Sequence, residues 1–424
     1  MTIRRRAADP FTELRELEAG ESYDELIDGV RELVAADRRA LVDPWVKAWC
    51  GRRWRNLFAS AAIEDPTAVS AATKRIGIPG TDLSIKTGLD RRRARQRIAE
   101  RFLKDVPGDE WVNELPPPRI PDPLEGTLVF CPGLIGSMLP LRAFQAAFPA
   151  VAAKHGWRVV SADAHPMRGC EANVDDLAAA VERGEGLDHD CRPIAPEAAE
   201  PPGDVFLLGY SKGTADALSM LIRRPDLAPR VKALYSWGGA IGGSHLADGA
   251  YELIKDMNVP PGTLGNAIRA VLRGLYPLIR FDAEAQRVDR FDVKAAIGDL
   301  TTWERGRFLE ENLEAIEAFD IPIFSITAAT AALEVPYFQV QGYRDIRRQS
   351  GDADNDMQVT QEQARWPGPL GVHLAKLHAH HWDMSYDAFP IATRLGSANL
   401  DHPFPREAAI TAIVQLTAEL GLIE

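Results

Sequence analysis

The residue of this sequence whose context best suits a nucleophile is a serine with a glycine two positions away on each side. The segment Asp204–Leu218 reads DVFLLGYSKGTADAL and places Ser211 in a G-x-S-x-G pattern. An apolar run precedes the pattern and an alanine-rich helical pattern follows it, which predicts a tight turn between a strand and a helix. The glycines suit that turn, because side chains there would collide with neighbouring backbone. Such a turn lifts the Ser211 hydroxyl to the carboxyl edge of a sheet, where α/β proteins bind ligands.

A serine hydroxyl needs a base to take its proton, and the oxyanion that its attack creates needs preorganised hydrogen-bond donors. One donor in this geometry is the backbone N–H of the residue after the nucleophile, Lys212. The second is expected from the loop after an earlier strand. The segment LVFCPGLIGSMLP supplies that loop, with Leu134 as the expected N–H donor.

From about Leu124 to its end, the chain resembles an α/β-hydrolase of the lipase and esterase kind. Besides GYSKG, three segments carry the resemblance, and they occur in the family's order. PGLIGS resembles the oxyanion-loop pattern H-G-φ-x-G-S, with Pro132 in place of the histidine. YSWGGAIGGSHLADG resembles T-x-x-P-H-x-G-S-x-x-A-D, and its Gly243, Ser244, Ala247 and Asp248 fit the second half. DADNDMQVTQEQARWPG resembles N-D-G-x-V-x-x-x-S-A-x-x-P-G, in which the aspartate belongs to the catalytic triad.

The resemblance implies a triad in the chain order Ser, Asp, His. Asp356 is the best match for the acid, with methionine in place of the family's usual glycine after it. Asp352 and Asp354 lie close by in the sequence. Glu334 is the alternative acid, because a simpler hydrolase carries its acid just after the strand expected at Pro322–Thr327.

The base is sought in HLAKLHAHHWDMSYD, which holds four histidines. His373 and His378 fall within a strand pattern, where a histidine usually serves structure. Relatives read D-H-W in the loop after that strand, which aligns His381 with the base and leaves His380 as the alternative. Such a cluster could also bind a metal ion. Because the triad uses the cluster without an ion, we expect neither a metal nor a cofactor.

Lys212 beside the serine raises the question of a Ser-Lys dyad. Dyads of the S-x-x-K kind place the two residues one helical turn apart, whereas adjacent residues at a tight turn project in different directions. We therefore expect Lys212 to act through its backbone N–H, with its ammonium paired to a carboxylate, and Lys212→Ala to retain much of the activity.

The wider sequence divides into a helical region, residues 1–117, and an α/β catalytic domain, residues 118–424. The proline-rich stretch LPPPRIPDPLEG marks the boundary. Beyond it, short apolar runs alternate with helical patterns, which predicts a mainly parallel sheet with helices on both faces. Between about residues 247 and 319 the pattern is all helical, which indicates a lid or cap. Its apolar residues are expected to form the lid core or to line an acyl pocket: Leu264, Ile268, Val271, Leu272, Leu275 and Leu278.

Composition narrows the class of protein further. The formal net charge of −12 argues against general nucleic-acid binding. Four cysteines without metal-type spacing, no apolar segment behind the basic start and no long apolar run lead us to expect a cytoplasmic protein without a transmembrane segment. Arg91–Lys104 is rich in basic residues, which indicates either the solvated face of a helix or a patch for an acidic partner or lipid. The sequence gives no indication of oligomeric state.

Together these features predict a serine hydrolase that cleaves carboxylic esters, with a small or lipid-like ester as its substrate. The same triad can act on thioesters, polyhydroxyalkanoates or lactones, and the sequence does not separate these activities. Ser211 argues against polyhydroxyalkanoate synthesis, because those synthases use cysteine as the nucleophile. A binding protein that has lost catalysis is the remaining alternative.

Overall fold

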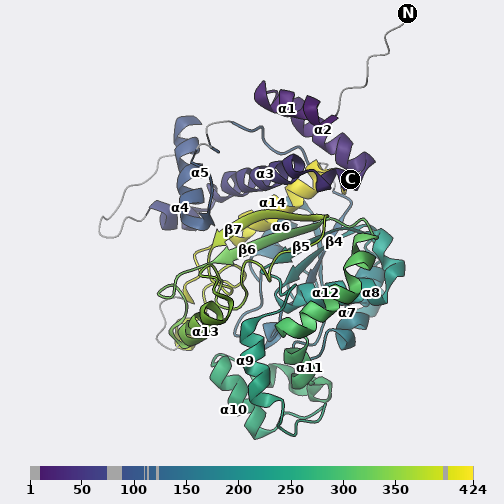
Figure 1. Cartoon of the computed structure of the whole chain (residues 1–424), viewed down its shortest axis with the longest axis vertical. Helices are drawn as coiled ribbons and strands as arrows, with labels where there is room; N and C mark the ends of the chain where they lie inside the picture. The colour runs from purple at the N-terminus through teal and green to yellow at the C-terminus, as the bar shows by residue number, and fades with distance from the viewer. Residues whose placement is uncertain are drawn as a thin grey trace, which may run out of the picture.

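The centre of the molecule is a seven-stranded sheet (Figure 1). The structure is a computed structural model that describes residues 10–73, 88–108, 110–111, 114–120, 124–394 and 400–423. The strand order is β1-β7-β6-β5-β4-β2-β3, and every neighbouring pair is parallel except β1 with β7. The strands are β1 (Leu103–Lys104), β2 (Thr127–Cys131), β3 (Arg158–Ser161), β4 (Val205–Tyr210), β5 (Val231–Trp237), β6 (Ile323–Ala329) and β7 (Gly371–His378). The predicted mainly parallel sheet is confirmed.

Successive side chains along the strands pack into two separate cores. On β2 and β4, Val129 and Leu207 belong to one core, whereas their neighbours Leu128 and Leu208 belong to the other. Because both faces are covered, the strands read as continuous apolar runs. One face is covered by α7 (Val174–Arg183), α8 (Lys212–Arg223) and α12 (Thr302–Glu317), the other by α3 (Pro44–Ala62), α6 (Ala147–His155) and α14 (Arg406–Glu419).

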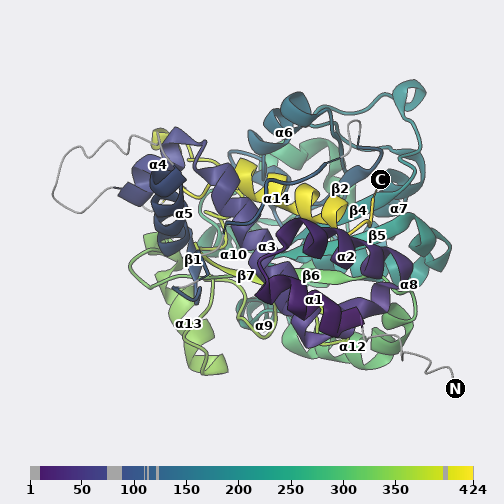
Figure 2. The same cartoon turned by 90° about the horizontal axis from the view of Figure 1, so that it is seen from above.

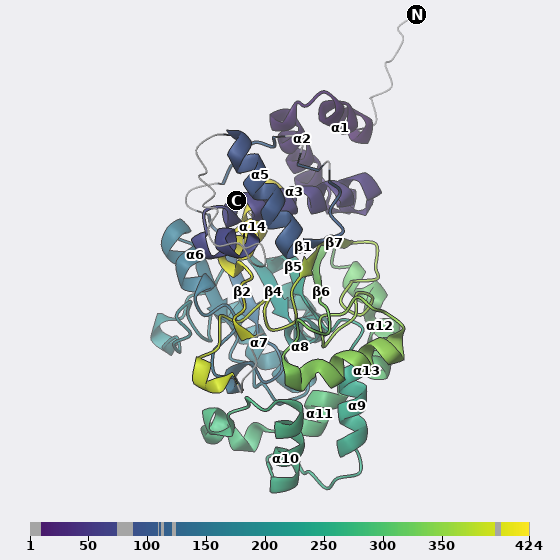
Figure 3. The same ribbon diagram turned by 90° about the vertical axis from the view of Figure 1, so that its left-hand side faces the viewer.

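The N-terminal region is mainly helical, as predicted, and the short strand β1 follows its last helix. It comprises α1 (Pro10–Ala19), α2 (Tyr23–Ala36), α3, α4 (Pro66–Thr73) and α5 (Gly88–Phe102). The aromatic side chains Trp54 and Phe58 of α3 lie in the core and stack on each other with ring centroids 5.3 Å apart. Arg53 of the same helix forms a buried ion pair with Glu419 of α14. Figures 1 and 3 show these helices at the opposite end of the molecule from α9–α11.

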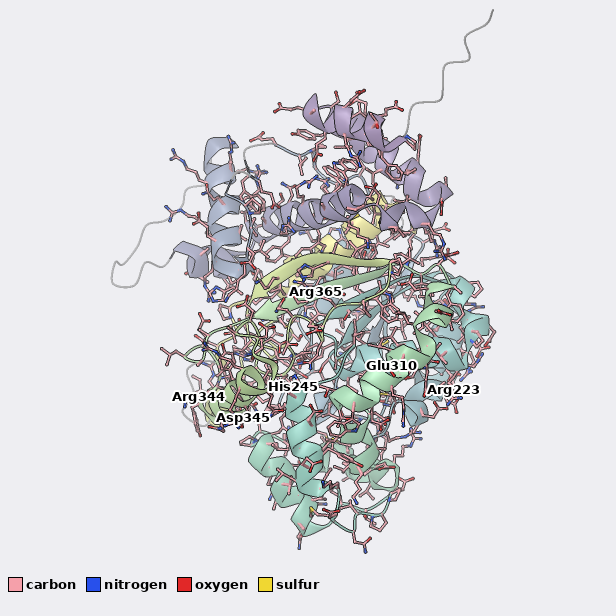
Figure 4. All side chains as sticks on the ribbon, viewed as in Figure 1. Arg223, His245, Glu310, Arg344, Asp345 and Arg365 are labelled. Carbon is pink, nitrogen blue, oxygen red and sulfur yellow. The ribbon has the colours of Figure 1, made fainter. Side chains whose placement is uncertain are left out.

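The segment between β5 and β6 is mainly helical, as expected. It holds α9 (His245–Ile254), α10 (Asn266–Leu275), a 3-10 segment (Phe281–Arg290), α11 (Val293–Gly298) and α12. The backbone of this segment meets the loop after β2, because Arg280 N–H donates to Met138 O at 2.7 Å. After β6, α13 (Val340–Ser350) packs against α9. Figure 4 labels His245 of α9 and both Arg344 and Asp345 of α13 near this junction.

All four cysteines are free thiols, so Cys170 and Cys191 are not joined by a disulfide. Within the described ranges, no helix combines the length and the apolar character that crossing a bilayer requires.

Candidate active site

Ser211 occupies a strained turn between β4 and α8. Its backbone has φ 54° and ψ −122°, a conformation that a residue with a side chain adopts only when its surroundings enforce it. The flanking glycines are required by close backbone contacts. A Cβ on Gly209 would lie 2.7 Å from Thr214 Cα, and a Cβ on Gly213 would lie 1.9 Å from Cys131 O. The predicted strand-turn-helix and the predicted steric reason for its glycines are confirmed.

Asp356 and His381 lie side by side and are almost fully buried. His381 Nδ1 is 2.7 Å from Asp356 Oδ2. The other carboxylate oxygen, Oδ1, accepts hydrogen bonds from the backbone N–H groups of Gln358 and Val359 at 2.9 and 2.7 Å. His381 N–H also donates to the backbone carbonyl of Asp356 at 2.8 Å. These hydrogen bonds fix the carboxylate and the imidazole in one orientation. The contact between Nδ1 and the carboxylate assigns the proton of the neutral imidazole to Nδ1.

The remaining nitrogen of His381, Nε2, is buried and has no hydrogen-bond partner in the described part of the chain. Its ring is held by Tyr210, which stacks on it with centroids 5.0 Å apart and donates its hydroxyl proton to His381 O. A Cβ on Gly238 would come within 3.4 Å of both His381 Cε1 and Asp356 Oδ2.

Ser211 lies at the carboxyl end of β5, where its backbone N–H donates to the carbonyl oxygen of Trp237 at 3.2 Å. No hydrogen bond between described atoms joins Ser211 to His381. Catalytic hydrogen bonds are often long in the absence of substrate, so this geometry is compatible with a serine-histidine pair. The arrangement leaves Nε2 available as a proton acceptor beside the turn that carries the serine.

The expected oxyanion loop lies directly beside Ser211. A Cβ on Gly133 would be 3.1 Å from Ser211 Cβ, so a larger residue there would crowd the serine. The next residue, Leu134, lines the same cavity as Ser211. No described atom accepts a hydrogen bond from the backbone N–H of Leu134 or of Lys212. Both groups can therefore donate to an oxygen bound at Ser211.

The alternative residues have other partners. Glu334 pairs with His378, whose Nε2 is 2.9 Å from its Oε1, and this hydrogen bond lowers the pKa of Glu334 to about 2. His380 Nδ1 accepts a hydrogen bond from Asp383 N–H at 3.2 Å, and its ring packs edge-on against His402. His373 Nε2 is 3.0 Å from Thr327 Oγ1. The histidines of the cluster thus have separate partners, and only His381 is paired with the predicted acid.

Met357, where the related family has glycine, adopts φ 77° and is fully buried. The left-handed conformation explains why glycine suits this position. Here the methionine side chain fills core space beside the Asp356 loop instead.

The Lys212 side chain does not point to solvent. It is buried in α8, and its Nζ is 2.5 Å from Oδ1 of Asp216, one helical turn later. Oδ2 of Asp216 accepts a hydrogen bond from Asn173 Nδ2 at 3.1 Å. Burial by itself lowers the pKa of Lys212, but the acidic groups around it, Asp216 foremost, together raise that pKa above its usual value. The expected pairing of the ammonium with a carboxylate is found. Because this ion pair is buried, the lysine side chain also supports the fold, and we revise the expectation that Lys212→Ala retains much of the activity.

Replacing Lys212 by methionine is expected to lower the free energy of unfolding by about 3–5 kcal/mol, because Asp216 would remain buried without a counter-ion. The matched control is the double variant Lys212→Met, Asp216→Asn, which removes both charges and keeps a partner for Asn173. It should recover a large part of the loss in guanidinium denaturation. A loss below about 1 kcal/mol in the single variant would show that this ion pair does not stabilise the fold.

An apolar cavity opens beside Ser211 under the helical segment. Its roof comes from α9, α10 and the residues around α11, and its volume is about 30 Å³. Of the six apolar residues expected as lid core or pocket wall, Leu275 lines it, while Ile268, Leu272 and Leu278 are buried in the core. The other residues that line the cavity are Leu134, Ala240, Ser244, Leu246, Ala247, Ala250, Tyr276, Ile297, Leu300, Gln358 and Val359.

Sequence reasoning missed three residues that position this site. Tyr210 stands inside the G-x-S-x-G pattern, but nothing in the pattern shows that its ring covers a histidine 171 positions later. Gly238 was visible only as part of a glycine pair after β5. Asp216 could have been found, because Lys212 and Asp216 have the i, i+4 spacing of helical ion pairs.

Comparison with known proteins adds evidence on the fold. At the level of sequence, no family model and no curated protein matches the chain. Among solved structures, a metagenomic carboxyl esterase is similar with a TM-score of 0.54 and 21% identity, over 86% of this chain and 91% of the esterase. The lipase of Staphylococcus hyicus, at a TM-score of 0.43 and 12% identity, is matched over 70% of this chain and 98% of its own.

The structural similarity to the esterase extends over most of both chains at low identity, which supports the fold and leaves the chemistry to the site itself. The parallel sheet, the strained serine turn after β4 and this similarity agree with the resemblance found in the sequence. The chain has the α/β-hydrolase fold, of the kind found in lipases and esterases.

Proposed function

We propose that the protein is a serine hydrolase that cleaves carboxylic esters through an acyl-enzyme. The observation that carries the proposal is the 2.7 Å contact between Asp356 Oδ2 and His381 Nδ1, with Nε2 unpartnered beside the Ser211 turn. A histidine held this way is fixed in the tautomer that can accept a proton from a serine.

In the proposed reaction, Ser211 Oγ attacks the ester carbonyl carbon while His381 Nε2 takes the hydroxyl proton. The N–H groups of Leu134 and Lys212 stabilise the oxyanion. The C–O bond to the alcohol breaks, and His381 gives its proton to the leaving oxygen. A water molecule then attacks the acyl-enzyme, with His381 again as base, and releases the carboxylic acid and free Ser211. Asp356 stabilises the imidazolium in both halves.

The cavity beside Ser211 supports an uncharged acyl group. None of the described residues that line it is Asp, Glu, Lys or Arg. With a volume of about 30 Å³, the cavity is too small for a long acyl chain unless α9 and α10 move. The proposal therefore favours small acyl groups in the observed conformation.

Nitrophenyl esters of increasing acyl length test this proposal. We expect kcat/KM to be highest for acetate and butyrate and to fall towards dodecanoate, measured by nitrophenolate release from the purified protein. Failure to hydrolyse any member of the series would contradict ester hydrolysis. A maximum at dodecanoate would leave ester hydrolysis standing and contradict the inference that the small cavity limits acyl length.

A further inference from the structure

A second cleft lies away from the candidate active site, where the N-terminal helices meet the α/β domain. It has a volume of about 420 Å³. Arg91 and Arg95 of α5 line it together with Lys154 and His155 at the end of α6. Residues of α3, the segment 115–118 and α14 complete its walls. Figures 2 and 3 show these helices gathered on the side of the sheet away from α9–α11.

The charges around this cleft are not balanced. None of its described lining residues is acidic, whereas three carry a full positive charge. The nearest acids stand at the rim: Glu64 is 3.8 Å from Arg91 and Glu114 is 4.0 Å from Arg95, and both acids are mostly exposed. Such long, solvated pairs neutralise little of the charge. In a chain with a net charge of −12, a cleft whose described charged lining residues are all basic calls for an anion.

Two buried nitrogen atoms in the cleft lining have no hydrogen-bond partner among the described residues. They are Nε of Arg95 and Nε2 of His155. The imidazole is fixed by Trp157, which stacks on it with ring centroids 4.3 Å apart. Burial lowers the pKa of Arg95. Attraction by Glu114 opposes this lowering, whereas repulsion by Arg92 and Arg91 adds to it. An anion would supply the missing acceptor for these nitrogens and relieve the repulsion.

The rest of the wall determines what the anion is attached to. Apolar side chains make up much of the cleft, contributed by Leu57, Ala61, Ile63, Leu115 and the three prolines 116–118. We propose that the cleft binds a small amphipathic anion, with a carboxylate or phosphate head held by Arg91, Arg95 and Lys154 and an apolar body against the proline wall. This site gives the basic run of α5 a binding role and does not depend on ester hydrolysis.

Titration calorimetry with four probes tests the proposal. We expect octyl phosphate and octanoate to bind, inorganic phosphate to bind more weakly, and 1-octanol not to bind measurably. The ratio between the two octyl anions identifies the preferred head group. Equal binding of 1-octanol and octanoate would show a merely apolar cleft and overturn the proposal.

Matched variants show where the anion binds. Arg95→Gln and the exposed Lys154→Gln should each weaken octyl phosphate binding by about tenfold, because each removes a charge-assisted contact. Arg97→Gln, on the exposed side of the same helix, should leave affinity unchanged. Affinity unchanged in the Arg95 and Lys154 variants would contradict the site, and would place any bound anion elsewhere, for example beside Ser211.

Discussion

Replacing Ser211 by alanine is expected to lower kcat for nitrophenyl ester hydrolysis by about 10⁶-fold, the size of effect that follows loss of the nucleophile in a serine triad. The fold should survive, because the Ser211 side chain makes no hydrogen bond with a described residue and alanine adds no atoms. Initial rates and a guanidinium denaturation curve measure the two effects separately.

Ser219→Ala is the matched control for this variant. Ser219 stands on the same helix, and its hydroxyl donates only to Ala215 O at 3.0 Å. It should retain nearly wild-type kcat. If Ser211→Ala keeps more than about a tenth of the wild-type rate, Ser211 is not the nucleophile, since removing a nucleophile costs far more.

Asp356→Asn is expected to lower kcat by about 10⁴-fold. The asparagine can turn its NH₂ towards His381 Nδ1 and favour the tautomer that carries its proton on Nε2, where it cannot accept the serine proton. Glu334→Gln should change kcat by less than tenfold, because Glu334 pairs with His378 and not with His381. The comparison uses the same ester and the same pH for both variants.

These two acids are a direct test of the site, because the sequence offered both. A larger loss in Glu334→Gln than in Asp356→Asn would assign the acid to Glu334 and require His378 or a rearranged loop as its partner. Equal, small losses in both would show that the histidine works without a carboxylate.

The strands and the serine turn were predictable because their signals are local. A short apolar run followed by G-x-S-x-G and a helical pattern leaves few alternatives. Gly209 is required by its contact with Thr214 in the same turn, and Gly213 by its contact with Cys131 of the adjacent strand β2. The ordered motifs also placed Asp356 and His381 as a pair. That pairing spans 25 residues and depends on the loops after β6 and β7 meeting at one edge of the sheet.

Other features could not be read from sequence patterns. Almost every residue of α14 is buried, so it lacks the one-sided periodicity that marks a surface helix. The pairing of Glu334 with His378 and the stacking of Tyr210 on His381 depend on tertiary contacts alone. The sequence left open which apolar residues of the helical segment form the lid core and which line the cavity beside Ser211, because helical spacing does not show which apolar face meets the core and which meets the site.

Labelling with a fluorophosphonate, followed by peptide mass spectrometry, tests the central claim most directly. The reagent phosphonylates a serine only where a base activates its hydroxyl and donors stabilise the developing oxyanion. We expect a single adduct on the peptide that contains Ser211 in the wild-type protein, and none in Ser211→Ala. An unlabelled wild-type protein, or an adduct that persists in Ser211→Ala, would contradict the proposed catalytic site.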